Sequence, residues 1–477
     1  MKAVIPAIIA LAAAPAAAED AMVIIRFDPV DNHVTIDFPT TQSNQLDGAT
    51  PPDWLTLASD TQHPVLTGTL PALARDARGL GASETGAYLF DPLAWLPEPF
   101  ASAHQSVRIE TPVPFRGVVA GDLLSETHSD GLYTATFRVD RSLAEADVFF
   151  GPYEISENLL ELPGGTVRLR TYFLAKDQAY AEAYLDASAR YITRYSQDVG
   201  HYPNAGFAVV SAPIPVGYAF DGLTLIREAS LAHPYMLGRS LAHEILHNWW
   251  GSGVRVDYSA GNWAEGLTTY LADHALAEDH DPAAATEMRY NWLTTLSNLP
   301  VGQDKPLRRF RSAGHDGDQS VGYGKAAMLF HDLRQRLGAE AFDNAIRQFW
   351  HLHRDKRAGW DDLQAVFSAA ASKDLSRYFG QWLDREGLPR ICLEDVELER
   401  RENEFAVTFS LSQTSPPYSL RVPVLIETEQ GPSEVTLHIK EAQRTATIDV
   451  PARPIKLEIA PYHHMLRALS KDELPLT

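Results

Sequence analysis

The stretch that decides how this chain is interpreted is LAHEILHNWWG, residues 241–251. It contains the pattern His-Glu-x-x-His, in which the histidines are His243 and His247. On a helix these two side chains lie one turn apart on the same face, so both imidazoles can reach one metal ion. Glu244 lies beside them, where its carboxylate can contact a water on that ion rather than the ion itself. The same pattern can arise by chance as two solvated histidines on a surface helix. The neighbouring sequence is therefore needed to distinguish a metal site from a chance match.

A candidate for a third ligand follows 18 positions after His247. A catalytic zinc ion normally has three protein ligands and a water. Glu265, in the run NWAEG at 262–266, supplies a carboxylate at the start of a second helical pattern. The metzincin pattern is excluded, because Trp250 and Gly253 stand where that class needs Gly and His. The residues therefore predict a site for one Zn²⁺ in which Glu265 joins the two histidines, and amide hydrolysis in which Glu244 moves the proton of the attacking water.

The composition is that of a globular protein of several domains. The 477 residues are 45% hydrophobic and 22% charged, and such a length is enough for roughly two to four domains. The formal charge of −21 argues against nucleic acid and anionic membrane surfaces as partners. The lone cysteine, Cys392, excludes an intrachain disulfide and a cysteine zinc cage. We expect its side chain to be a small buried hydrophobe at the start of a strand.

Three regions differ in their residue patterns. Residues 19–168 carry short β-branched and aromatic runs between turn residues, which predicts an antiparallel β-sandwich. Residues 169–389 carry long helical patterns and one strand-like run, and residues 390–477 return to alternating strands of a second, smaller sandwich. We therefore expect a multidomain α+β chain with the metal site in its mainly helical middle domain.

The first 18 residues resemble a secretory signal peptide. One positive charge at Lys2 is followed by a short apolar run and by an Ala-x-Ala ending at Ala18. The apolar part is shorter than the roughly 20 residues that a membrane span needs. The alternative is a short buried N-terminal helix. The sequence predicts a protein exported to the periplasm or secreted, with no integral membrane segment after cleavage.

At these residues the chain resembles the zinc aminopeptidase N family of gluzincins, which also includes leukotriene hydrolase. The resemblance rests on His-Glu-x-x-His, on the run at 262–266, which is similar to the family's Trp-x-x-Glu-Gly, and on VGYGKA at 321–326, which is similar to its Tyr-x-Lys-Gly. It implies a thermolysin-like catalytic domain and peptide substrates. It also implies that Tyr323 donates a hydrogen bond to the developing oxyanion. The resemblance further implies a substrate-binding edge strand formed by Gly217, Tyr218, Ala219, Phe220 and Asp221.

The chain departs from the family pattern at three places. The spacing between His247 and Glu265 is one residue shorter than usual. The acid that usually follows the ligand Glu by seven positions falls on Ala272, and the adjacent Asp273 lies about 100° away on an ideal helix. We therefore expect residues other than Asp273 to support the zinc ligands. The family's Gly-x-Met-Glu-Asn reads GYAFDGL at 217–223, so the Glu that binds the substrate's ammonium group is replaced by Phe220 or displaced to Asp221.

Four functions are weighed from the sequence. An aminopeptidase is favoured, with Asp221 as the partner of the ammonium group. Without that partner, the chain would be an atypical peptidase that accepts blocked or internal peptide bonds. A non-catalytic binding protein with structural zinc is disfavoured, because such a site needs neither Glu244 nor Tyr323. A non-peptide substrate is also open, by analogy with leukotriene hydrolase, whereas the sequence gives no indication of oligomeric state.

Overall fold

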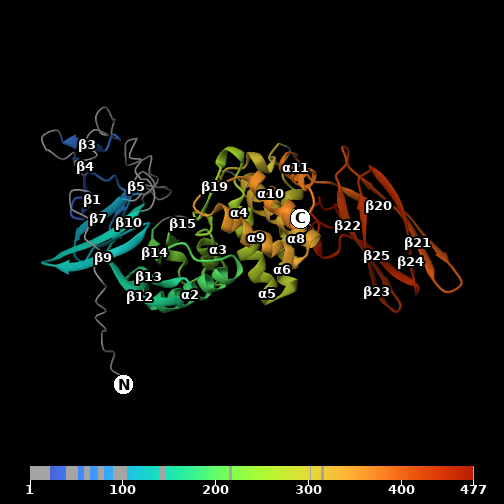
Figure 1. Cartoon of the computed structure of the whole chain (residues 1–477), viewed down its shortest axis with the longest axis horizontal. Coiled ribbons are helices and arrows are strands. Elements are labelled where there is room, and N and C mark those ends of the chain that lie inside the picture. The colour runs from blue at the N-terminus through green and yellow to red at the C-terminus, as the bar shows by residue number, and fades with distance from the viewer. Residues whose placement is uncertain are drawn as a thin grey trace, which may run out of the picture. The chain divides into compact units, whose positions relative to one another are not determined.

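Figure 1 shows the computed structural model of the chain. It describes residues 22–38, 52–58, 65–73, 80–89, 105–139, 147–213, 217–300, 302–312 and 316–475. The expected signal peptide lies outside the described residues. The chain forms two compact units, one from residues 1–191 and 203–237 and the other from residues 192–202 and 238–477. The domain boundaries expected from the sequence stay a prediction.

Two β-sheets make up the N-terminal part of the first unit. The seven-stranded sheet has the order β3-β4-β2-β1-β7-β10-β9, and the four-stranded sheet has the order β5-β6-β11-β8. Their strands are β1 (Met22–Asp28), β2 (His33–Asp37), β3 (Leu55–Ala58), β4 (Val65–Thr69), β5 (Leu80–Ser83), β6 (Gly86–Leu89), β7 (Gln105–Pro112), β8 (Arg116–Val119), β9 (Asp122–Ser129), β10 (Leu132–Val139) and β11 (Val148–Gly151). The expectation of a purely antiparallel region is wrong at one pair. β1 and β7 run parallel, because β2 to β6 intervene in the chain and β7 does not follow β1 through a hairpin.

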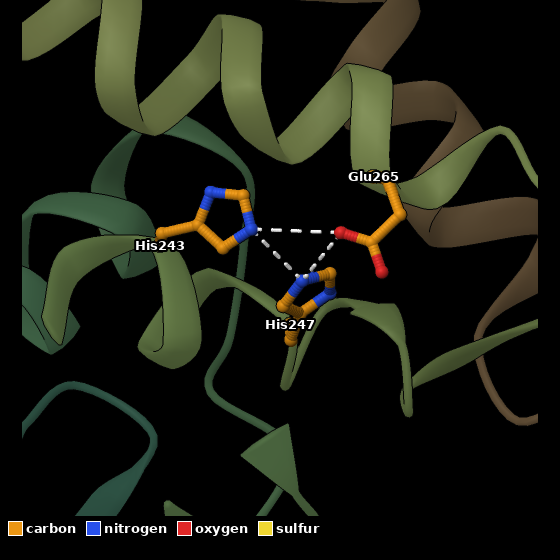
Figure 2. A group of neighbouring side chains, drawn as sticks. All are labelled: His243, His247 and Glu265. Carbon is orange, nitrogen blue, oxygen red and sulfur yellow. Dashed lines mark hydrogen bonds and ion pairs between the residues drawn. The ribbon is translucent and has the colours of Figure 1, made fainter. Parts of the chain in front are cut away.

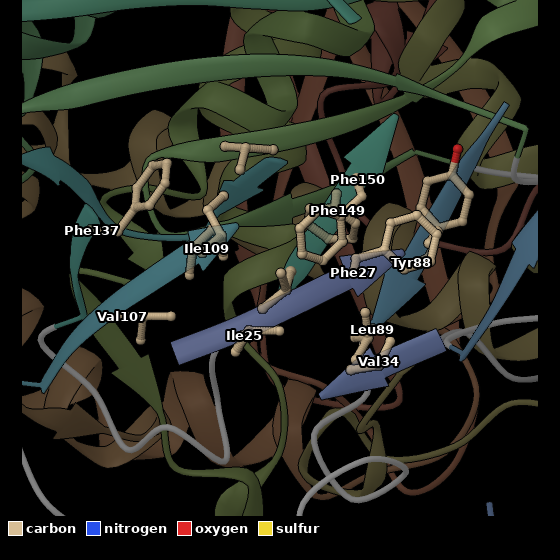
Figure 3. Packing of buried hydrophobic residues seen from close by; sticks show 14 of the residues in the cluster. Ile25, Phe27, Val34, Tyr88, Leu89, Val107, Ile109, Phe137, Phe149 and Phe150 are labelled. Carbon is tan, nitrogen blue, oxygen red and sulfur yellow. The ribbon is translucent and has the colours of Figure 1, made fainter. Parts of the chain in front are cut away.

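One hydrophobic core holds these sheets together (Figure 3). Alternate residues of β1, such as Ile25 and Phe27, are buried, as the period-two pattern of a half-covered strand requires. Phe27 and Phe150 of β11 stack with ring centroids 5.1 Å apart. The same core reaches Val210 and Leu225, which belong to the second sheet system of this unit.

That second system is a five-stranded sheet with the order β12-β13-β14-β16-β15. Its strands are β12 (Tyr153–Leu162), β13 (Gly165–Leu174), β14 (Gly206–Ala212), β15 (Tyr218–Phe220) and β16 (Leu223–Arg227). The amphipathic helix α2 (Ala181–Asp198) follows β13, within the region at 169–389 for which helical patterns were expected. β15 is the last strand of the sheet and pairs antiparallel with β16. Three of the five residues expected to form an edge strand therefore do so, and Gly217 and Asp221 flank that strand.

Helices dominate the second unit up to residue 383. They are α3 (Leu241–Leu246), α4 (Ala264–Thr268), α5 (Ala275–His280), α6 (Pro282–Ser297), α7 (Asp316–Gln319), α8 (Ala326–Leu337), α9 (Ala339–His353), α10 (Trp360–Ala370) and α11 (Ser376–Leu383). Local sequence explains their ends. Asp281 caps α6 by accepting from the amide of Ala283, with Pro282 at the first helical position, and Gly338, at a φ of 82°, ends α8. Within the described residues, no helix combines the length and the apolar character that a membrane span requires.

Three π-helical segments interrupt this helical region. They span Met236–Ser240, Thr269–His274 and Ser320–Lys325, and each adjoins an α-helix. The first leads into α3, the second connects α4 to α5, and the third leads into α8. π-helical turns are rare and occur mostly at functional sites. Here they border the three segments that carry the predicted site residues.

Short strands and two C-terminal sheets complete the second unit. β17 (Trp250–Gly251), β18 (Val254–Val256) and β19 (Arg357–Ala358) form a small parallel sheet. β20 (Ile391–Arg400), β21 (Phe405–Gln413) and β24 (Gln443–Val450) form one C-terminal sheet, and β22 (Leu420–Thr428), β23 (Gly431–Ile439) and β25 (Pro454–Ile459) form the other. The prediction that Cys392 is buried is wrong. It is exposed on the edge strand β20, opposite Ser412.

Candidate metal centre

The three predicted ligands lie together in the second unit. Nε2 of His243 and Nε2 of His247 are 3.2 Å apart, and Oε2 of Glu265 lies 3.6 Å from the first and 3.3 Å from the second. Figure 2 shows the three side chains pointing toward one another from two helical segments. Among the described residues they are the group whose geometry allows a shared metal ion.

Hydrogen bonds fix the orientation of both imidazoles. Nδ1 of His243 donates to Oδ2 of Asp273 at 2.6 Å, and Nδ1 of His247 donates to the carbonyl of Trp250 at 2.8 Å. With both Nδ1 atoms protonated, both Nε2 atoms present lone pairs. Oε2 of Glu265 is buried and accepts no hydrogen bond within the described part of the chain. When both imidazoles are neutral, as in a metal-bound site, three acceptors therefore face one another without a donor.

This donor set fits zinc. A tetrahedral Zn²⁺ at about 2.0–2.1 Å from each ligand holds the ligand atoms about 3.3 Å apart, which matches the three observed separations of 3.2, 3.3 and 3.6 Å. The carboxylate of Glu265 is also kept ionised. Burial alone would raise its pKa, but His247 and His243 hold that pKa well below its usual range. Two neutral imidazoles and one carboxylate form a ligand set typical of catalytic zinc sites.

Asp273 corrects one expectation from the sequence. Its Oδ2 accepts from His243, and its Oδ1 accepts from Nε of Arg239 at 2.5 Å, although the ideal α-helix placed it on the wrong face. The reason is the π-helical segment Thr269–His274. A π-turn takes up one residue more than an α-turn, so Asp273 occupies the face that Ala272 would have in a regular helix. Asp273 is only 5% exposed, and His243 and Arg239 outweigh its burial and lower its pKa.

Glu244 and Tyr323 border the three ligands. Glu244 follows His243 in α3 and is partly buried. Its burial raises its pKa against the opposing effect of the two histidines. The ring of Tyr323 stacks on that of His243, with centroids 6.2 Å apart and an angle of 12° between the planes. Burial and the negative charge of Glu265 raise the pKa of Tyr323, so its phenol keeps the proton that it would donate.

A close helix crossing relates Glu265 to Tyr323. Gly266, directly after the ligand, lies so close to α8 that a Cβ at this position would come within 2.2 Å of the Cβ of Ala326 and 3.1 Å of the carbonyl oxygen of Gly322. Only a glycine allows this approach. The Gly of the motif at 262–266 therefore brings the helix that carries Glu265 against the segment that carries Tyr323.

The five residues predicted to bind substrate lie in the first unit, whereas the ligands lie in the second. The ring of Phe220 lies 5.6 Å from that of Phe149 and packs against the hydrophobic core. Asp221 and Gly222 form the two-residue connection between β15 and β16, and Gly222 has a φ of 64°. Asp-Gly is a common hairpin turn, a signal that sequence reasoning missed. The proposed role of Asp221 with an ammonium group stays a prediction.

Sequence reasoning also missed several supporting residues. Arg239, the partner of Asp273, stands four positions before His243, a spacing that puts both on one helix face. Oδ1 of Asn262 accepts from the amide of Ala264, the first residue of α4, at 3.0 Å. The carbonyl that orients His247 left no trace in the sequence, because any residue supplies one.

Comparison with known proteins agrees with this geometry. Residues 224–382 match the Peptidase family M1 domain. This match, together with the aminopeptidase N relatives, supports an aminopeptidase N-like gluzincin family for residues 224–382. The match identifies its middle region as a zinc metallopeptidase domain, in which His243, His247 and Glu265 are the residues placed to hold the ion.

The M1 relatives are distant and longer than this chain. Aminopeptidase N of Lactococcus lactis subsp. lactis is 23% identical over 223 residues, which cover 39% of this chain and 25% of that protein. Aminopeptidase N of Escherichia coli strain K12 is 24% identical over 256 residues, 46% of this chain and 29% of that protein. The alignments thus span less than a third of either curated relative.

Two solved structures share the fold. Legionella pneumophila aminopeptidase A, in complex with aspartic acid, has a TM-score of 0.66 at 14% identity and covers 93% of this chain and 58% of its own. A variant of a two-domain M1 zinc metallopeptidase bound to L-arginine has a TM-score of 0.58 at 19% identity. The match covers 76% of this chain and 91% of that protein's chain. Both support an α+β chain with an N-terminal β-sheet region and a helical catalytic region.

Proposed function

We propose that this chain is an exported zinc peptidase that removes residues from the free N-terminus of peptides. The observation that carries the proposal is the arrangement of Glu244 and Tyr323 around a ligand set of two imidazoles and one carboxylate. A structural zinc site needs neither a general base nor a phenol donor. The apolar run and Ala-x-Ala at residues 1–18 support export.

Glu244 is the proposed proton carrier. Zn²⁺, when bound, would supply Lewis acidity that polarises the substrate carbonyl and acidifies water. The carboxylate of Glu244 takes the proton of the attacking water and returns it to the leaving amine. Burial that raises its pKa makes it a better base than an exposed glutamate.

Tyr323 is the proposed oxyanion donor. Its protonated phenol donates to the oxygen of the tetrahedral carbon, on which negative charge develops only in the transition state. The contact with the ring of His243 limits how far the phenol can move. Tyr323 therefore lowers the activation barrier without tightening the binding of the substrate.

A specific observation favours an alternative to recognition of the free N-terminus. Phe220, one of the two residues that could stand in place of the family's Glu, packs against the core, and Asp221, the other, forms part of a hairpin turn. If Asp221 does not pair with the ammonium group, the peptidase acts without strict N-terminal recognition. The single amino acids in the two related structures, aspartic acid and L-arginine, support recognition of a free ammonium group. The proposed thermolysin-like domain and flanking sandwiches rest on the family resemblance.

Paired peptides that differ only in N-terminal acetylation test the proposal. We expect the free amine to be cleaved much faster, and Asp221→Ala to remove most of this preference while zinc content stays at one ion per chain. Asp198→Ala, at an exposed carboxylate of α2, is the control and should leave the preference intact. Equal rates on both peptides in the unmodified chain would contradict the aminopeptidase assignment and establish the atypical peptidase.

A further inference from the structure

A fully buried lysine lies two residues after Tyr323. The side chain of Lys325 is 0% exposed, and its Nζ donates to Oδ1 of Asp304 at 2.9 Å and to the carbonyl of Arg385 at 3.4 Å. Oδ2 of Asp304 accepts from the amide of Gly387. Burying an ammonium group is costly unless it is paired. A buried ion pair nevertheless contributes little net stability. We therefore ask which parts of the structure this pair holds in place.

The pair ends the π-helical segment that carries Tyr323. This segment spans Ser320–Lys325, and π-helical backbone is rare because its surroundings have to hold it. Phe310 supplies a second contact. Its ring lies 6.3 Å from that of Tyr323, and it closes on Gly322 so tightly that a Cβ there would come within 2.0 Å of the ring. The segment 304–310 therefore touches the π-turn on both sides of Tyr323.

The same segment is also bonded to the start of the ligand helix. The amide of Asn262 donates to the carbonyl of Phe310 at 2.8 Å, and Nδ2 of Asn262 donates to the carbonyl of Arg311 at 3.0 Å. Oδ1 of Asn262 accepts from the amide of Ala264, the first residue of α4, and Glu265 lies in the first turn of that helix. One loop thus connects the metal-ligand helix to the segment that carries the phenol.

We propose that the buried Lys325–Asp304 pair is a positioning device that sets the phenol of Tyr323 relative to the metal ligands. Lys325 does not contact the reacting atoms and acts through Tyr323, so the inference rests on the proposed role of that phenol. The ammonium group fixes the end of the π-turn to the loop at Asp304. Phe310 holds the middle of the same turn, and Asn262 holds the loop to the helix of Glu265.

Lys325→Met tests this by steady-state kinetics. We expect kcat to fall roughly 10- to 100-fold, as displacement of a catalytic group by about 1 Å does, while KM changes less than about twofold, because the phenol acts only in the transition state. Zinc should stay at one ion per chain. Lys305→Met is the matched control, because the Lys305–Asp318 pair lies on the same loop but the lysine is 42% exposed. It should leave kcat unchanged.

The decisive experiment introduces Lys325→Met into a chain that already carries Tyr323→Phe. If Lys325 acts through the phenol, Lys325→Met causes no further loss of kcat once the phenol is gone. An equal fold loss in both backgrounds would show a merely structural role and overturn the inference, as would an unchanged kcat in the single variant. Should Lys325→Met fail to fold with its partner unpaired, Lys325→Met with Asp304→Asn removes both charges, and the same kinetic outcomes apply.

Hydrogen exchange separates this inference from the proposed function. If the unmodified chain hydrolyses no peptide, the proposed function fails, but the device still makes a prediction. Lys325→Met should speed amide exchange in residues 302–312 and 320–325 and leave residues 241–247 unchanged, whereas Lys305→Met should not. Unchanged exchange in 320–325 would overturn the device independently of activity.

Discussion

Replacing Asp273 by Asn tests the way in which this chain supports its metal ligands. Asp273 holds Nδ1 of His243 at 2.6 Å and Nε of Arg239 at 2.5 Å while being 5% exposed. Asparagine keeps the size of the side chain and can still accept from the imidazole. It loses the negative charge that strengthens the ligand and leaves the guanidinium of Arg239 without its ionic partner there.

The expected loss follows from these contacts. Changing a partner of a metal-bound histidine costs about 10- to 100-fold in metal affinity, or roughly 1.4–2.7 kcal/mol at about 1.36 kcal/mol per tenfold. Two effects act together, because the imidazole becomes a weaker donor to the ion and Arg239 is left beside it. We therefore expect the zinc affinity to fall nearer to the upper end of that range.

Competition with a chromophoric zinc chelator measures this affinity. The control is Asp279→Asn, six positions further along the chain, at a carboxylate that is 58% exposed and pairs with Arg194. It should change the dissociation constant by less than about twofold, since exposed pairs contribute little. An Asp273→Asn chain that binds zinc as tightly as the unmodified chain would refute the claim that the π-turn delivers a functional partner to His243.

Three further outcomes are expected. Glu244→Gln should keep zinc and fold but lower turnover by roughly 10²–10⁴, the usual contribution of acid–base catalysis; near-normal turnover, measured on the zinc-loaded variant, would remove this residue from the mechanism. Tyr323→Phe should lower kcat by roughly 10²–10³ with little change in KM, and an unaltered kcat would contradict its role. Stability should fall as the pH drops from about 6.5 toward 4. Burial, and then the charge of Arg289, lower the pKa of His464 to about 4, and burial also lowers that of His331. The folded chain keeps the two imidazoles neutral, 2.9 Å apart, whereas the unfolded chain binds these protons below its pKa of about 6.5. Urea unfolding should give a lower free energy of unfolding at pH 4.5 than at pH 7, and His464→Gln should make this difference smaller. An equal difference in both chains would show that His464 does not contribute to the pH dependence of stability.

The parts of the site that depend on short-range spacing could be predicted from the sequence. His243 and His247 are one turn apart on any helix, and Glu265 opens the next helical segment, so the ligand set follows from residue types and order. The mainly helical middle region follows from periodicity in the same way, whereas the edge strand of the five-stranded sheet was expected only from the family resemblance. The spacing of the two histidines required only regular helix geometry, whereas Glu265 is brought to them by a connection that contains β17 and β18.

The parts that depend on irregular backbone or on distant partners could not be predicted. A single π-turn within a helical region has no recognisable sequence pattern, so the sequence was interpreted as a regular α-helix and Asp273 was placed on the wrong face. The parallel pairing of β1 and β7 depends on residues 84 positions apart. Lys325 and Asp304 illustrate the same limit, since a buried lysine is recognised only when its partner and its surroundings are known.

Metal analysis of the purified chain, combined with cleavage of a peptide mixture, tests the central claim most directly. We predict one zinc ion per chain, loss of hydrolysis on complete chelation, and recovery when one equivalent of zinc is returned. His247→Ala should lose both the ion and the activity. Hydrolysis that survives complete removal of metal, or one bound zinc ion in a chain that lacks His247 and Glu265, would contradict the account.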